Sequence, residues 1–111
     1  MRIEFTSPQF PASGALVVFA AKGADLAASA AEVDRLTSGA LGRAIKASRY
    51  DGSRGDVVEI LAPSGLDASR VILVGLGTPG ELTPVEFEKI GGQITARLLT
   101  SGEARVTVLL D

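Results

Sequence analysis

Apolar residues gather in short runs along the chain, and the spacing within the runs predicts β-strands. Residues 1–6 alternate between polar and apolar side chains, which predicts an edge strand with one face in solvent. Residues 15–21 are all apolar and rich in β-branched side chains, which predicts a central strand buried on both faces. Three further runs predict strands at 57–61, 71–74 and 106–110.

Between the second and third runs, an alanine-rich stretch with scattered charges predicts two helices. Ser29 and Glu32 fit a capping box, which would open a short helix that ends near Thr37. Gly39 offers the left-handed residue that often closes a helix. A second helix should then end near Ser48.

The clearest helix start lies near the end of the chain. Thr83 and Glu86 form a second capping box, with Pro84 at the first helical position, where its missing N–H costs nothing. The glycine pair at 91–92 weakens this helix by about 1 kcal/mol per residue relative to alanine. It therefore predicts an interruption where the backbone lies close to a neighbour. Four apolar residues fall on one helix face: Phe87, Ile90, Ile94 and Leu98.

The order of these elements predicts an α/β domain in three layers, with a mixed β-sheet between helices. A helix joins strands 71–74 and 106–110, so we expect these strands to pair in parallel or to lie near each other. Residues 1–111 fit one domain. Because the last strand runs up to Asp111, we expect the natural protein to continue, with this chain as one domain of something longer.

The composition narrows the possible kinds of site. Hydrophobic residues make up 46% of the chain and charged residues 22%, as in a well-cored globular domain. The chain has no His and no Cys, which excludes Cys/His zinc sites, disulfides and Cys or His nucleophiles. Acidic residues are scattered, so we identify no catalytic residue, metal ligand or cofactor site.

Charge and hydropathy narrow the possible partners and location. The chain has a net charge of −2, without the excess of positive charge that is typical of a dedicated nucleic-acid binder. No apolar run approaches the length of about 20 residues that crosses a bilayer, so we expect no membrane partner and a cytoplasmic location.

A glycine motif follows the strand predicted at 71–74. Gly75, Gly77 and Gly80 have the GxGxxG spacing of a dinucleotide fingerprint. That fingerprint needs a helix that begins inside the motif, whereas the capping signals here delay the helix to Thr83. We interpret the motif as a strand-to-helix turn. Exposed amides in such a turn can nevertheless bind an anion.

Basic residues form a second candidate site. Arg43, Lys46 and Arg49 recur at a spacing of three on the second predicted helix, and Arg54 follows in a turn predicted at 50–55. They predict contact with a phosphate or a nucleic acid, with an affinity that falls as salt rises. The alternative interpretation is a solvated helix face.

Several segments, taken in order, resemble the N-terminal domain of the cytosolic leucyl aminopeptidases, peptidase family M17. They are SGALGRAIKASR at 38–49, LAP at 61–63, RVILVGLG at 70–77 and the glycine-bearing helix at 87–99. The resemblance implies a macro-like α/β domain ahead of a catalytic domain that holds two divalent metal ions, Mn or Zn. That catalytic domain would hydrolyse N-terminal residues from peptides. None of its metal-binding motifs occurs here, so no catalytic or metal residue is carried over.

The resemblance also implies partners and a role. Family members form hexamers, so the partners would be the protein's own catalytic domain, other subunits and the peptide substrate, and the role would be assembly and substrate access. Some bacterial members bind DNA, for which the basic residues are the candidate. Two alternatives stay open: a stand-alone macro-like module that binds ADP-ribose or another phosphate ligand at the 75–80 turn, and a pure oligomerisation domain.

Overall fold

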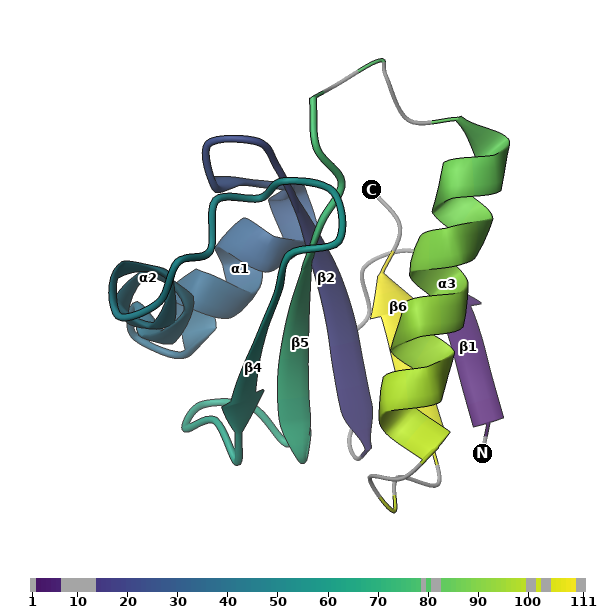
Figure 1. The fold of residues 1–111 in the computed structure, drawn as a ribbon. Helices are drawn as coiled ribbons and strands as arrows, with labels where there is room; N and C mark the ends of the chain where they lie inside the picture. Colours follow the sequence, from purple (N-terminus) through teal and green to yellow (C-terminus); the bar gives the residue numbers. More distant parts are fainter. Residues whose placement is uncertain are drawn as a thin grey trace.

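The computed structural model describes residues 2–6, 14–78, 80, 83–99, 102 and 105–109. Within these residues the chain forms strands that make up one sheet and helices that lie on its two faces (Figure 1). In chain order they are β1 (Arg2–Thr6), β2 (Ala15–Ala21), β3 (Asp25–Leu26), α1 (Ala28–Leu36), α2 (Ala40–Lys46), β4 (Val57–Leu61), β5 (Arg70–Gly75), α3 (Pro84–Leu99) and β6 (Arg105–Leu109). Apart from β3, each was predicted from the sequence, with ends that differ by at most a few residues.

The described strands form one mixed sheet in the order β1-β6-β2-β5-β4. β2 pairs in parallel with both β5 and β6, and β1 pairs in parallel with β6. β4 runs antiparallel to β5, and the short β3 pairs antiparallel with the end of β2. The edge position predicted for 1–6 and the central position predicted for 15–21 are confirmed.

β5 and β6 do not pair, because β2 lies between them. They are parallel to β2 and therefore to each other, one strand apart. Of the two predicted outcomes, pairing or lying near, the structure shows the second. Leu110, the predicted last residue of this strand, lies outside the described residues.

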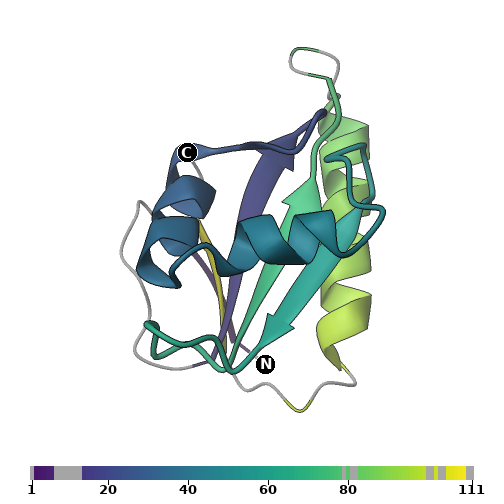
Figure 2. The same cartoon turned by 90° about the vertical axis from the view of Figure 1, so that its left-hand side faces the viewer.

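Helices cover both faces of the sheet, which confirms the three-layer prediction. α1 and α2 lie on one face and α3 on the other (Figures 1 and 2). Successive residues of β2 enter opposite cores: Val18 packs in the core under α1 and α2, and Phe19 packs in the core under α3. All residues of β2 are apolar because both faces of the strand are buried.

The capping box predicted at Ser29 and Glu32 is wrong. α1 begins at Ala28, with Ala27 as its N-cap and no side-chain hydrogen bond from that cap. Ser29 is already inside the helix and buried against the sheet, whereas the carboxylate of Glu32 pairs with the guanidinium of Arg35 on the exposed side. The helix therefore starts two residues before the position that a Ser29 cap predicts, and Ser29 is one of its buried residues.

The turn between α1 and α2 uses two left-handed residues. Ser38 takes a φ of 57° immediately after α1, and Gly39 follows with a φ of 84° as the N-cap of α2. Their amides donate to the carbonyls of Arg35 and Asp34 at 3.2 and 2.7 Å. The carboxylate of Asp34 then accepts from the amide of Gly42 at 2.9 Å, in the first turn of α2. Gly39 was predicted to close α1, but Ser38 occupies the closing position.

α3 follows its predicted start but not its predicted interruption. The amide of Glu86 donates to the hydroxyl oxygen of Thr83 at 3.2 Å, which is one half of the capping box. The helix continues through Gly91 and Gly92, and a Cβ added at either would meet no atom within 4 Å. The close neighbour predicted there is therefore absent from the described part of the chain. The sequence also predicts that Ser101 and Gly102 end this helix; Gly102 lies in a turn, and Ser101 is outside the described residues.

Candidate functional site

The candidate site lies at the carboxyl ends of β2 and β5, which are adjacent parallel strands. The chain leaves β2 toward α1 on one face of the sheet and leaves β5 toward α3 on the other. Such a point, where neighbouring strands lead to opposite faces, is where open α/β sheets bind ligands. A cavity of about 320 Å³ lies there, lined by Lys22, Ser53, Arg54, Leu76, Gly77 and Thr78.

Backbone hydrogen bonds fix the walls of this cavity. Beyond the ends of β2 and β5, the amide of Leu76 donates to the carbonyl of Ala20, and the amide of Lys22 donates to the carbonyl of Gly77, each at 2.9 Å. The amide of Gly77 donates to the carbonyl of Gly52 at 2.9 Å and so attaches the loop before β4. Three segments far apart in sequence are thereby held together by their backbones.

Two glycines allow that loop to approach the sheet. A Cβ on Gly52, whose φ is 73°, would lie 2.0 Å from the carbonyl oxygen of Ala21. A Cβ on Gly75 would lie 2.2 Å from the carbonyl oxygen of Ser53. No side chain fits at these distances, so the first glycine of the GxGxxG motif serves close packing.

In the predicted anion-binding turn, the amides of Gly75 and Gly77 already donate hydrogen bonds within the fold. The amide of Gly75 donates to the carbonyl of Asp56 at 2.7 Å, and the amide of Gly77 donates to Gly52. Gly80 is exposed with a φ of 85°, beside positions outside the described residues. The helix begins only at Pro84, as expected for a turn rather than a dinucleotide fingerprint. Any anion held at this end of the sheet must therefore rely mainly on side chains.

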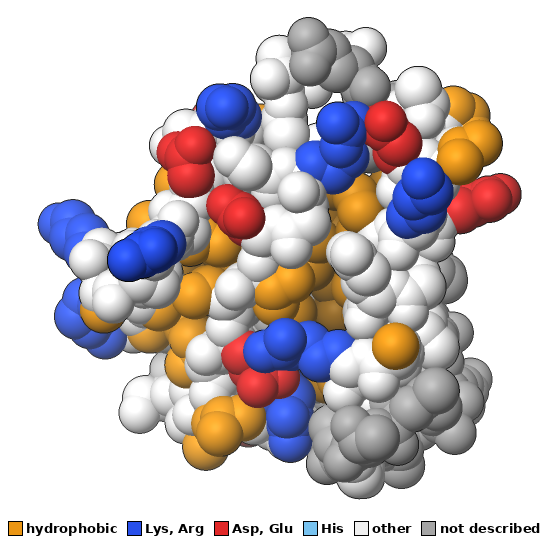
Figure 3. Space-filling view, viewed as in Figure 1, with side chains coloured by type: hydrophobic (Ala, Val, Ile, Leu, Met, Phe, Trp, Pro, Cys, Tyr) orange, Lys and Arg blue, Asp and Glu red, His pale blue; other side chains and the backbone are white. Residues whose placement is uncertain are grey.

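The predicted basic residues separate into two groups. Arg43 and Lys46 lie on α2, followed by the exposed Arg49, and Figure 3 shows Lys and Arg side chains over α2 at the left edge of the molecule. Arg54 instead forms an ion pair with Glu86 on α3, the helix of the opposite face. The structure therefore brings Arg54 to the cavity, whereas Arg43 and Lys46 stay on the exposed surface of α2 and Arg49 follows just after it.

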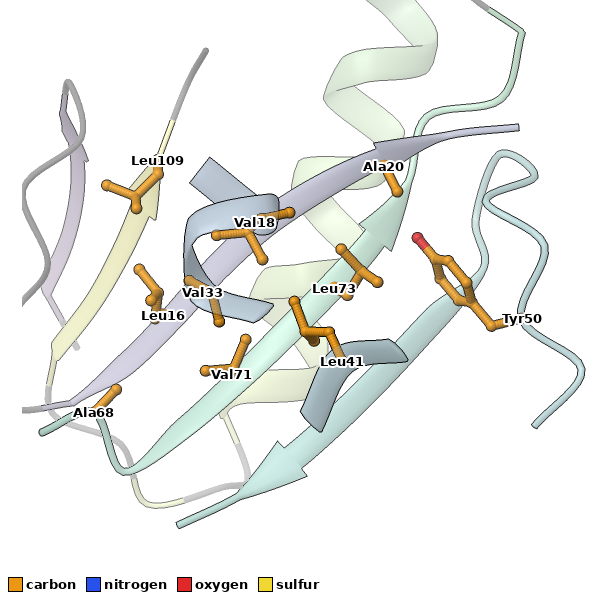
Figure 4. Packing of buried hydrophobic residues seen from close by; sticks show 11 residues of the cluster. Leu16, Val18, Ala20, Val33, Leu41, Tyr50, Ala68, Val71, Leu73 and Leu109 are labelled. Carbon is orange, nitrogen blue, oxygen red and sulfur yellow. The ribbon is translucent and has the colours of Figure 1, made fainter. Parts of the chain in front are cut away.

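Tyr50 is a feature that sequence reasoning missed, because the residue was assigned to a turn. Its ring belongs to the core under α1 and α2, where Figure 4 shows it near Leu73. Within the described residues, its buried hydroxyl has no hydrogen-bond partner. Burial, and secondly the charge of Asp56, raise the pKa of Tyr50 above its ordinary value of about 10.

The α3 face of the sheet is incompletely covered. An apolar hollow of about 150 Å³ lies between α3 and strands β2 and β6, where the rings of Phe19 and Phe87 stand 6.4 Å apart. A groove of about 240 Å³ runs along the other side of α3, over residues of β4 and β5 such as Val57 and Val74. Figure 3 shows hydrophobic side chains in the space between β4 and α3.

Two kinds of feature are not found in the part of the chain that the structure describes. There, no group of three or more Asp or Glu residues could hold a metal ion. In the same residues, no helix has both the length and the apolar character that a membrane span requires.

Comparison with known proteins gives consistent matches. The N-terminal domain of the cytosol aminopeptidase family matches residues 17–111. A probable cytosol aminopeptidase of Caulobacter vibrioides is 38% identical over 99% of this chain and 23% of its own length. A second one, from Shewanella oneidensis, is 47% identical over 66% of this chain and 15% of its own length. The chain therefore spans less than a quarter of these relatives.

A solved structure has the same fold. A tomato leucine aminopeptidase variant superimposes over 97% of this chain and 22% of its own chain, with a TM-score of 0.72 and 22% sequence identity. At this sequence identity the match shows a shared fold only. That shared fold agrees with the three-layer α/β arrangement of this chain.

Proposed function

The chain belongs to the cytosol aminopeptidase family, and on that premise we propose that it is the non-catalytic N-terminal domain of a metal-dependent leucyl aminopeptidase. The observation that carries the proposal is the match of residues 17–111 to the N-terminal domain of the family. In this proposal, peptide hydrolysis takes place in a catalytic domain that binds two Mn or Zn ions. The protein acts in the cytoplasm as a homo-hexamer, in which this domain contributes to assembly and substrate access.

We further assign the contact with the catalytic domain to the α3 face. A largely parallel sheet is normally covered on both faces, and here a hollow and a groove flank the single helix. Phe87, which lines the hollow, exposes 37% of its surface, and Val85, two residues earlier on α3, exposes 60%. Exposed apolar groups next to an open core are typical of a surface that a partner covers.

A chimera tests the assembly role. In the Caulobacter vibrioides relative, the segment that this chain matches is replaced by this chain, and hexamer formation and hydrolysis of a leucyl amide are measured. We expect a hexamer with activity close to that of the parent. We expect an enzyme with the segment deleted to lose the hexamer. A deleted enzyme that assembles and turns over like its parent would contradict the proposed role.

Matched variants of the chimera test the assigned surface. Val85→Asp places a charge on α3, and Ala31→Asp places one on α1, which covers the opposite face of the sheet and where Ala31 is exposed. We expect Val85→Asp to reduce the hexamer fraction and Ala31→Asp to leave it unchanged. Equal behaviour of the two variants would place the contact elsewhere.

The isolated chain tests the non-catalytic assignment. We expect the 111-residue chain to release no leucine from leucyl amide with added Mn²⁺, whereas the chimera does. Turnover by the purified chain, at a rate proportional to its concentration, would refute the assignment. The Caulobacter, Shewanella and tomato proteins are all aminopeptidases, so they give no support to a stand-alone ADP-ribose module.

DNA contact is a second candidate function, favoured by the exposed side chains of Arg43 and Lys46 on α2 and of Arg49 shortly after it. Their charges can approach a phosphate backbone without rearrangement of the fold. We expect binding of labelled duplex DNA that weakens steeply between about 50 and 200 mM salt. An affinity that is the same at both salt concentrations, or in a variant with all three residues changed to Gln, would count against this function.

A further inference from the structure

We propose that the cavity at the carboxyl ends of β2 and β5 binds the phosphate group of a small ligand through the side chains of Lys22, Ser53, Arg54 and Thr78. This inference goes beyond the aminopeptidase assignment and does not depend on it. It also differs from an amide-lined turn, because the amides of Gly75 and Gly77 are already bonded within the fold.

The position of the cavity is the first argument. It lies where adjacent parallel strands lead to opposite faces of the sheet, the place where this class of fold leaves a crevice. Its volume of about 320 Å³ is at the lower end of the range for small-molecule sites. A compact ligand or ligand group is therefore the appropriate size.

The chemistry of the lining is the second argument. Lys22 and Arg54 are cationic, and none of the six lining residues is acidic. Ser53 and Thr78 add hydroxyl groups, so the four polar side chains can all donate hydrogen bonds. They come from three separate segments around one space, which suits a tetrahedral oxyanion that accepts in several directions better than a planar carboxylate.

The rigidity of the walls is the third argument. The segments that carry Lys22, Arg54 and Thr78 are joined by backbone hydrogen bonds of 2.9 Å through Gly77 and Gly52. A Cβ on Gly77 would lie 3.3 Å from the Cβ of Arg54, so the loop and the turn are already in close contact. Little backbone ordering is then required on binding, which favours affinity for a small ligand.

Two carboxylates adjoin the cavity and oppose binding. Arg54 contacts Glu86 through one of its terminal nitrogens, and the Ser53 hydroxyl donates a hydrogen bond of 3.4 Å to a carboxylate oxygen of Asp51, which it must give up to donate to an anion. The guanidinium has further N–H groups on its other edge, so it can contact an anion while it remains beside Glu86. Glu86 therefore weakens the site without closing it, and its removal should strengthen binding.

Calorimetry with inorganic phosphate and pyrophosphate on the 111-residue chain tests the site, with acetate as the planar anion. We expect saturable phosphate binding, and with Lys22→Gln or Arg54→Gln a loss of affinity of about tenfold or more, the size of one charge-assisted hydrogen bond. Lys46→Gln is the matched control, because it removes the same charge from α2, and it should bind like the unaltered chain. No phosphate binding, stronger acetate binding, or an equal loss in Lys46→Gln would overturn the proposal.

Glu86→Gln tests the same site, but it should raise the affinity for phosphate rather than lower it. Glutamine keeps the capping position at the start of α3 but leaves Arg54 without its acidic neighbour. We expect phosphate to bind more tightly to this variant, and an unchanged or weaker affinity would remove Arg54 from the site. Circular dichroism of each variant ensures that a loss of binding is not a loss of fold. Because no hydrolysis is measured, failure here leaves the aminopeptidase assignment standing.

Discussion

α1 and α2 cover one face of the sheet, whereas α3 alone covers the other (Figure 2). Under the two helices, the centre of the core is closed. Large side chains from the strands and the helices are fully buried there, including Leu16, Val18, Val33, Leu41 and Leu73, and partly buried ones such as Ile45 and Ile60 pack against them. Beside α3, a hollow and a groove remain on either side of the helix, and Phe87 stays partly exposed.

The difference follows from the width of a sheet relative to a helix. A helix with its side chains is about 10–12 Å across, and strands are spaced about 4.8 Å apart, so one helix covers little more than two strands. α3 buries Ile90, Ile94 and Leu98 along one stripe and leaves the flanking strands short of cover. The face under α1 and α2 is therefore the more completely covered, and the α3 face retains the apolar surface to which we assign the contact with the catalytic domain.

Leu41→Ala should produce the largest loss of stability. Leu41 is fully buried on α2, in the closed core, where surrounding side chains have little room to collapse into the space left. We expect a loss of about 4 kcal/mol in the free energy of unfolding. Urea denaturation followed by circular dichroism measures it, and a loss below about 1 kcal/mol would mean that this core is not tightly packed.

Ile94→Ala is the counterpart on the open face. Ile94 lines both the hollow and the groove, so its neighbours already have free space on one side and fewer contacts to lose. We expect a smaller loss of about 2 kcal/mol in the same experiment. If Ile94→Ala proved as costly as Leu41→Ala, the contrast between the two faces would be wrong.

Tyr50→Phe removes a buried hydroxyl that has no partner among the described residues. Because desolvation of that group opposes folding, we expect the variant to be more stable by about 1 kcal/mol at neutral pH. A loss of stability would show that the hydroxyl has a partner in solution.

The same residue predicts a pH dependence. The pKa of Tyr50 is raised above its ordinary value of about 10, so above that pH the unfolded chain releases a proton that the folded chain keeps. The contribution of this group is fully present below about pH 10 and is lost as the pH rises. We expect unfolding midpoints to fall more steeply above about pH 10 in the unaltered chain than in Tyr50→Phe.

Gly91→Ala should produce the smallest effect, and a favourable one. A Cβ at Gly91 meets no atom within 4 Å, and alanine has the higher helix propensity. We expect a gain of about 0.5–1 kcal/mol, read from the thermal midpoint of the 111-residue chain. Gly52→Ala is the control that should lower stability, since its Cβ would lie 2.0 Å from the carbonyl oxygen of Ala21. A destabilised Gly91→Ala would reveal a neighbour that the described residues do not include.

Local signals in the sequence were sufficient for most of the elements. The Thr83 cap was predicted because Thr83 and Glu86 interact within one turn of helix. The limits of β2 were predicted because a strand buried on both faces is apolar throughout. β3 was missed because two residues are too few to show a period. Ser29 was misassigned because its place depends on burial against the sheet rather than on its neighbours in sequence.

The candidate site was only partly predictable. The glycine motif and Arg54 were identified, but Lys22 was not. The amides of the motif were considered able to bind an anion, whereas the fold uses those of Gly75 and Gly77 to attach the loop before β4. Arg54 was grouped with Arg43 and Lys46 by its closeness in sequence. It lies instead beside Glu86, 32 positions away along the chain, and near Lys22 in the cavity.

The sequence by itself determined the elements other than β3, their order and the α/β class, because helix capping, glycine turns and hydrophobic periodicity act over a few residues. Only the tertiary structure decided that β6 lies between β1 and β2, and that the ends of β2 and β5 meet the loop at 50–56 in one cavity. Parallel strands are not joined by tight turns, so nothing local fixes which of them become neighbours. That choice rests on how the two cores pack across the whole sheet, and it sets where the functional side chains meet.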